Sequence, residues 1–204
     1  RRARVFLIEK GLPYGLVPVV PFPPANATPE FRRMSPLGKI PALADGDFAI
    51  SDSSVICAYL ERRQPEPALY PAEPQAFARA LWLEEFADGR MAETIGPVFF
   101  QRVVQPKFFR QAPDEALVRT ALTEGLPPVL DYLEGQLGDA EWLVAGRFSI
   151  ADIAVATMLR QLRIGGESGG AGRWPKLAAF TERALARPSF KGCAADEDQL
   201  LASL

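Results

Sequence analysis

Asp52 and Ser53 stand side by side, immediately before a stretch whose apolar spacing predicts a helix over residues 53–63. A helix N-terminus presents unbonded backbone N–H groups, and together with a serine hydroxyl these groups bind a carboxylate. The adjacent Asp52 could hold an ammonium group. A carboxylate beside an ammonium is the head of an α-amino acid. The alternative interpretation is that the pair only caps the helix.

A second cluster, Lys39-Ile40-Pro41, precedes a segment that reads as a β-hairpin over residues 41–50. Cis peptide bonds are mostly confined to proline, and a cis Ile40–Pro41 bond would turn the N–H and C=O of Ile40 away from the sheet. Those groups could pair with the backbone of a short extended peptide, while Lys39 meets a terminal carboxylate. The alternative is a proline that merely starts a strand, beside a solvated lysine.

Other residue types narrow the chemistry further. The chain contains no histidine, which excludes Ser-His and Cys-His nucleophile systems and histidine-bearing zinc sites. The net charge of −2 gives no reason to expect nucleic acid or an anionic membrane as a partner, and no apolar run approaches the roughly 20 residues of a membrane span. Cys57 and Cys193 lie far apart, so we expect a reducing, cytoplasmic location and no metal.

Three further motifs have a structural alternative. Phe99, Phe100 and Arg102 follow a long helical stretch and form either core packing or the apolar wall of a ligand pocket. Ser149 and Asp152 have the spacing of a capping box and predict the start of a buried helix. The glycine-rich residues 165–172 follow a helix, not a strand, so we interpret them as a loop and not as a dinucleotide-binding motif.

The elements that must position these residues fall into two parts. Residues 1–66 mix helices and strands, with a helix near residues 2–10, an edge strand at residues 15–22, the hairpin and the 53–63 helix. A proline-rich linker follows at 67–74, and residues 75–204 read as helical throughout, with Pro97 ending or kinking the first long helix.

The first helix lacks a capping residue, and arginines at positions 1, 2 and 4 oppose its dipole. With no initiator methionine either, we expect an upstream segment that carries a further strand.

The stretches "SPLGKIPAL", "DFAISDSSVICAYLE" and "GRFSIADIAVA", in this order around a proline-rich linker, resemble the cytosolic glutathione transferases. The resemblance implies an α/β thioredoxin-like N-terminal domain, an all-α C-terminal domain and a homodimer. It also implies that glutathione is the co-substrate, bound by Lys39 at its glycine carboxylate and by Ile40, before a cis Pro41, at its cysteinyl backbone. Asp52 and Ser53 would hold the γ-glutamyl ammonium and carboxylate.

The reaction implied by the resemblance is attack of the glutathione thiolate on a small hydrophobic electrophile. The Ser, Tyr or Cys that activates the thiol is expected upstream of or around Arg1, and the electrophile near Phe99, Phe100 and Arg102. Two alternatives remain open at this stage. One is a non-catalytic binding or regulatory module of the same fold. The other is a different glutathione-dependent reaction, namely isomerisation, dehalogenation or thiol reduction.

Overall fold

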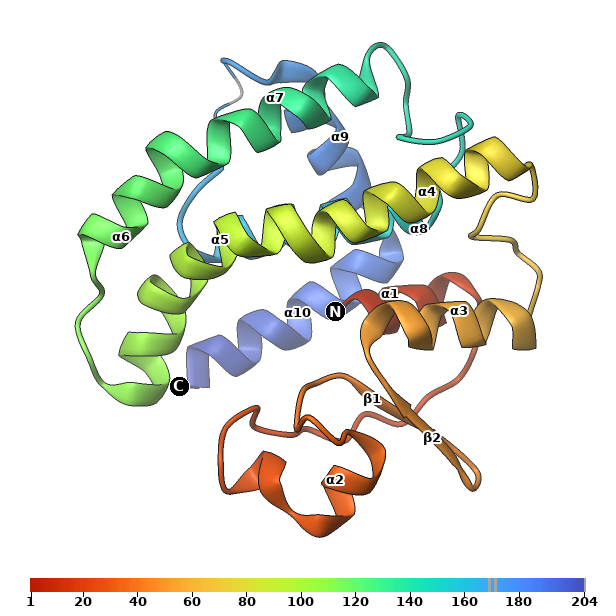
Figure 1. Cartoon of the computed structure of the whole chain (residues 1–204), viewed down its shortest axis with the longest axis vertical. Coiled ribbons are helices and arrows are strands. Elements are labelled where there is room, and N and C mark those ends of the chain that lie inside the picture. The colour runs from red at the N-terminus through yellow and green to blue at the C-terminus, as the bar shows by residue number, and fades with distance from the viewer. Residues whose placement is uncertain (169, 171, 204) are drawn as a thin grey trace. The chain divides into compact units, whose positions relative to one another are not determined.

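The computed structural model describes residues 1–168, 170 and 172–203, and divides into two compact units, Arg1–Leu69 and Tyr70–Leu204 (Figure 1). The division falls inside the 67–74 stretch that the sequence analysis expects as a linker.

The N-terminal unit combines short helices with one β-hairpin. Its elements are α1 (Arg2–Glu9), the 3-10 turn η1 (Ala25–Ala27), α2 (Pro29–Met34), β1 (Ala42–Asp45), β2 (Phe48–Ser51) and α3 (Ser53–Arg63). Helices α1 and α3 lie side by side (Figure 1), and they bury Phe6, Ile56 and Leu60. The turn of the hairpin contains Gly46, whose φ of 61° lies in the left-handed region that glycine adopts without strain.

The end of α1 is tied to the chain that follows α3. The side chain of Lys10 is fully buried, forms an ion pair with Glu61, and donates to the carbonyls of Pro65 (3.1 Å) and Pro67 (2.7 Å). Glu61 in turn accepts from the backbone N–H of Leu69 at 3.2 Å. These bonds fix the exit from α3 against the end of α1.

The prediction of an edge strand at residues 15–22 is wrong. These residues form neither helix nor strand, and Leu16, Val17 and Val20 are exposed. Among the described residues, β1 and β2 pair only with each other, so nothing supplies a ladder for this segment. Pro18 also lacks the N–H that a ladder position requires.

The C-terminal unit is helical in every regular element that the structure describes. The elements are α4 (Pro74–Phe86), η2 (Ala87–Met91), α5 (Ala92–Phe99), η3 (Phe100–Phe109), α6 (Glu115–Thr120), η4 (Ala121–Gly125), α7 (Leu126–Leu137), α8 (Ile150–Ile164), α9 (Pro175–Leu185) and α10 (Pro188–Ser203), of which η2, η3 and η4 are π-helical. The helix does not end at Pro97 but continues through it to Phe109. Residues 165–168, 170 and 172 form the expected loop, whereas residues 169 and 171 lie outside the described residues.

Helix α8 forms the core of this unit and packs against α4, α5 and α9. It begins with the predicted capping box, in which Asp152 accepts from the N–H of Ser149 at 2.8 Å. The second carboxylate oxygen of Asp152 accepts from the N–H of Leu143 at 2.9 Å, which anchors the preceding loop to the helix.

Candidate functional site

The hairpin brings the two predicted clusters to one place. Its antiparallel register pairs Ala42 with Ser51, so the preceding Pro41 and the following Asp52 leave the ladder at the same end. Neighbouring strands lie about 5 Å apart, so residues that flank one cross-strand pair are close neighbours. Local strand pairing therefore places Pro41 beside Asp52, and the chain segments that carry the two clusters leave the ladder at the same end.

Asp52 divides its carboxylate between two tasks. The Oδ1 atom caps α3 by accepting from the N–H groups of Ser54 (2.9 Å) and Val55 (3.2 Å). No bond to Oδ2 is present within residues 1–168, 170 and 172–203, and the residue is exposed, so this oxygen can accept from an ammonium group. The backbone of Asp52 has a φ of 82°, which costs a non-glycine residue about 1–3 kcal/mol.

Ser53 is the first residue of α3 and is half-buried. Its hydroxyl makes no hydrogen bond within the described part of the chain, and it lies at the positive end of the helix dipole. The hydroxyl and the dipole together suit a carboxylate. Asp52 Oδ2 and the Ser53 hydroxyl are thus both available for the predicted pairing of an ammonium with a carboxylate.

Lys39 and Ile40 supply the other end of the site. The Ile40–Pro41 peptide bond is cis, and Ile40 is 49% exposed. Its N–H and C=O make no hydrogen bond to any residue that the structure describes, so both remain available to an extended ligand. The carbonyl of Lys39 accepts from the buried Ser35 hydroxyl at 2.7 Å, which holds the loop, while the Lys39 side chain is exposed.

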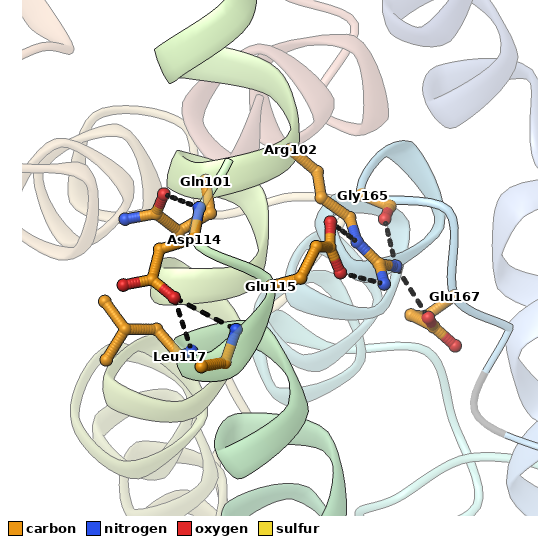
Figure 2. Close-up of polar contacts among 8 residues, drawn as sticks. Gln101, Arg102, Asp114, Glu115, Leu117, Gly165 and Glu167 are labelled. Atoms are coloured by element: carbon orange, nitrogen blue, oxygen red, sulfur yellow. Dashed lines mark hydrogen bonds and ion pairs between the residues drawn. The ribbon is translucent and has the colours of Figure 1, made fainter. Parts of the chain in front are cut away.

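The predicted pocket residues belong to the C-terminal unit and are arranged differently. Phe99 is half-buried at the end of α5, and Phe100 is exposed beside Phe109, with ring centroids 6.3 Å apart. Figure 2 shows that the guanidinium of Arg102 is already engaged: it binds Glu115 at 3.0 Å and Glu167 at 2.7 Å.

These bonds define what Arg102 can do. It also donates to the carbonyl of Gly165 at 3.2 Å, so one side chain joins η3, the start of α6 and the turn after α8 (Figure 2). Its hydrogen bonds with Glu115 first, and then with Glu167, raise the pKa of the guanidinium. The arginine therefore stays charged and paired, and it shapes this surface instead of offering free donors.

An aromatic groove on α4 and α7 carries no signal in the sequence analysis. It has a volume of about 290 Å³ and is lined by Trp82, Phe86, Arg90, Pro128, Val129 and Tyr132. Trp82 is 52% exposed, and its indole N–H donates to the Tyr132 hydroxyl at 2.6 Å. The groove is created by the packing of two helices that are distant in sequence, so the sequence alone could not reveal it. In the folded structure, the exposed Trp82 marks its position.

A metal site and a membrane-spanning helix each have their own structural requirements. The described residues contain no group of three or more His, Cys, Asp and Glu side chains that could hold a metal ion. Among the helices of the described residues, none has both the length and the apolar composition that crossing a membrane requires.

Comparisons with known proteins identify the family. Residues 1–63 match the family model for the N-terminal domain of glutathione S-transferase, and residues 88–188 match that for its C-terminal domain. Glutathione S-transferase 3 of Zea mays is 33% identical over 194 residues, which cover 93% of this chain and 86% of the relative. The chain belongs to the glutathione transferase family.

Solved structures show the same fold for this transferase. Glutathione transferase F7 of Populus trichocarpa superposes with a TM-score of 0.85 at 27% identity, covering 95% of this chain and 92% of that one. A glutathione S-transferase I bound with lactoylglutathione gives the same TM-score at 26% identity, with the same coverage. The expected fold class, a thioredoxin-like N-terminal domain followed by an all-helical domain, is confirmed. The protein is a glutathione transferase enzyme, and the non-catalytic, isomerase, dehalogenase and reductase alternatives are not favoured.

Proposed function

We propose that this transferase binds glutathione along the end of the hairpin. The γ-glutamyl ammonium meets Asp52 Oδ2, its carboxylate meets the Ser53 hydroxyl at the N-terminus of α3, and the cysteinyl backbone pairs with Ile40 before Pro41. Lys39 meets the glycine carboxylate. The observation that supports this proposal is the shared end of the ladder, which both clusters leave with polar groups that make no hydrogen bond within the described chain: Asp52 Oδ2, the Ser53 hydroxyl and the backbone N–H and C=O of Ile40.

The test is calorimetric titration of the protein with reduced glutathione. Asp52→Asn is the sharpest variant, because asparagine caps a helix as well as aspartate does but carries no charge for the ammonium. We expect about a tenfold weaker affinity for Asp52→Asn, and a similar loss for Ser53→Ala. Asp47→Asn, an exposed acid near the turn of the same hairpin, is the matched control. Unchanged affinity in both site variants would overturn the proposed site.

For the second substrate, we propose a small hydrophobic electrophile that contacts Phe99 and Phe100, on a surface held in shape by Arg102. Support comes from the exposure of Phe100 and its ring contact with Phe109. The residue that activates the thiol, expected upstream of or around Arg1, stays a prediction. Conjugation of such electrophiles would serve detoxification. Cys57 and Cys193 are both buried thiols, which suits a reducing cytoplasm.

The aromatic groove supports a homodimer as the assembly. A second copy of the chain is the occupant that we propose for Trp82 and its neighbours, because Arg90 in the wall of the groove and the exposed Glu93, 3.8 Å from it, put both signs of charge beside the groove, as a surface that pairs with itself needs. Light scattering should report a dimer that Trp82→Glu converts to a monomer. Leu200→Glu, an equally exposed apolar residue on α10, should leave the dimer intact. A monomeric wild type would refute the assignment.

A further inference from the structure

A buried arginine stands at the start of α1. Arg2 is only 4% exposed, and the first turn of α1 contains no acidic residue that would offset its charge. Cations near a helix N-terminus oppose the helix dipole, so this placement works against α1 itself. The explanation must therefore lie outside that helix.

The guanidinium of Arg2 reaches the neighbouring helix at its N-terminal turn. Nη1 donates to the Ser54 hydroxyl at 2.8 Å, across 52 positions of sequence. The backbone N–H of Ser54 in turn donates to Oδ1 of Asp52, the residue with the left-handed backbone. One chain of hydrogen bonds thus runs from Arg2, through Ser54, to the carboxylate that flanks Ser53.

We propose that Arg2 is a positioning residue for glutathione, acting through Ser54 on the first turn of α3. It holds that turn so that the Ser53 hydroxyl faces the γ-glutamyl carboxylate at the N-terminus of α3, where the helix dipole attracts this carboxylate. This inference rests on the proposed function, because it needs glutathione at Asp52 and Ser53. It assigns the arginine to the carboxylate end of the ligand and not to the thiol.

The experiment compares two ligands by calorimetry: reduced glutathione, and 4-aminobutyryl-cysteinylglycine, in which a hydrogen replaces the γ-glutamyl carboxylate. Ser54→Ala and Arg2→Met should each weaken the binding of glutathione about tenfold and leave the affinity for the analogue nearly unchanged. The double variant should be no weaker than either single one, because both remove the same bond. Ser54→Thr, which retains a hydroxyl, should restore most of the affinity.

Arg4→Met is the matched control, since Arg4 lies on the same helix and donates to a different hydroxyl, that of Tyr14, at 3.2 Å. It should bind both ligands as the wild type does. If Ser54→Ala loses affinity for glutathione and for the analogue to the same extent, the role of the bond is merely structural and the proposal is overturned. If Arg2→Met does not fold, Ser54→Ala and Ser54→Thr decide the question alone.

The failure of this inference is distinguishable from failure of the proposed site. If Ser53→Ala weakens glutathione binding while Ser54→Ala does not, only the role of Arg2 is refuted. If Ser53→Ala and Asp52→Asn both bind normally, the site itself is wrong and the role of Arg2 falls with it.

Discussion

The buried carboxylate of Asp152 should make the C-terminal unit less stable as the pH rises through about 6. Asp152 is fully buried, and burial raises its pKa from 3.8 to about 6. The bonds from the N–H groups of Leu143 and Ser149 lower the pKa and only partly offset this effect. Asp152→Asn is the informative change, because it keeps the shape of the side chain while removing its titration.

The direction and size of this change in stability follow from the pKa of Asp152 in the folded protein and in the unfolded chain. The folded state holds the proton more tightly than the unfolded chain, so the stabilising contribution is complete below the unfolded pKa and is lost as the pH rises through the folded one. A shift of about two pKa units corresponds to about 3 kcal/mol. Between pH 7.5 and pH 4.5, the wild type should gain about 2 kcal/mol relative to Asp152→Asn.

At neutral pH, Asp152→Asn should already be less stable by about 2 kcal/mol, because an amide offers one acceptor oxygen where two buried N–H groups need one each. Urea unfolding followed by tryptophan fluorescence measures this, since Trp82, Trp142 and Trp174 all lie in the C-terminal unit.

Asp139→Asn is the control with the opposite sign. The exposed carboxylate of Asp139 has its pKa lowered by a hydrogen bond from Lys176, so its contribution is lost as the pH falls. A difference between wild type and Asp152→Asn that stays constant from pH 4.5 to pH 7.5 would refute the reasoning.

Other changes should act on single contacts. Lys10→Met leaves Glu61 without its buried ammonium, and we expect a loss of about 3 kcal/mol, measured as faster hydrogen exchange in α1. Gly38→Ala adds a Cβ 2.8 Å from the Arg32 guanidinium carbon at a φ of 68°, so it should weaken glutathione binding in calorimetry by displacing the loop before the cis proline. Arg102→Met leaves two glutamates facing each other and should lower the urea midpoint by an amount equivalent to about 1 kcal/mol, and an unchanged midpoint would contradict a tie between η3 and α6.

Local signals in the sequence predicted the elements that they determine. The hairpin, the helix at Ser53–Arg63 and the capping box of Ser149 and Asp152 all depend on residues within a few positions of one another, and all three are present. The grouping of the two candidate binding motifs also follows from local pairing, because a tight hairpin leaves its two ends together.

Features that depend on distant partners could not be predicted in the same way. A strand at residues 15–22 needs a neighbouring ladder, and apolar composition alone does not supply one. The bond from Arg2 to Ser54 and the groove at Trp82 arise from the packing of helices 50 or so positions apart in sequence. In the sequence, Arg2 is only an unfavourable charge at the start of a helix. The hydrogen bond that it donates to Ser54 is apparent only in the folded structure.

Helices α4 and α5 are continuous through the π-helical turn η2 (Ala87–Met91), and this turn changes the direction in which the side chains of α5 point relative to those of α4. One residue rotates an α-helix by about 100°, and each π-turn holds a residue more than an α-turn would. The one extra residue in this turn therefore makes Trp82 in α4 and Val98 in α5 point in directions that a continuous α-helix would not give them. Deleting one residue within this turn should rotate everything beyond it as a block, so variation in length here would redirect one apolar face without altering any of its side chains.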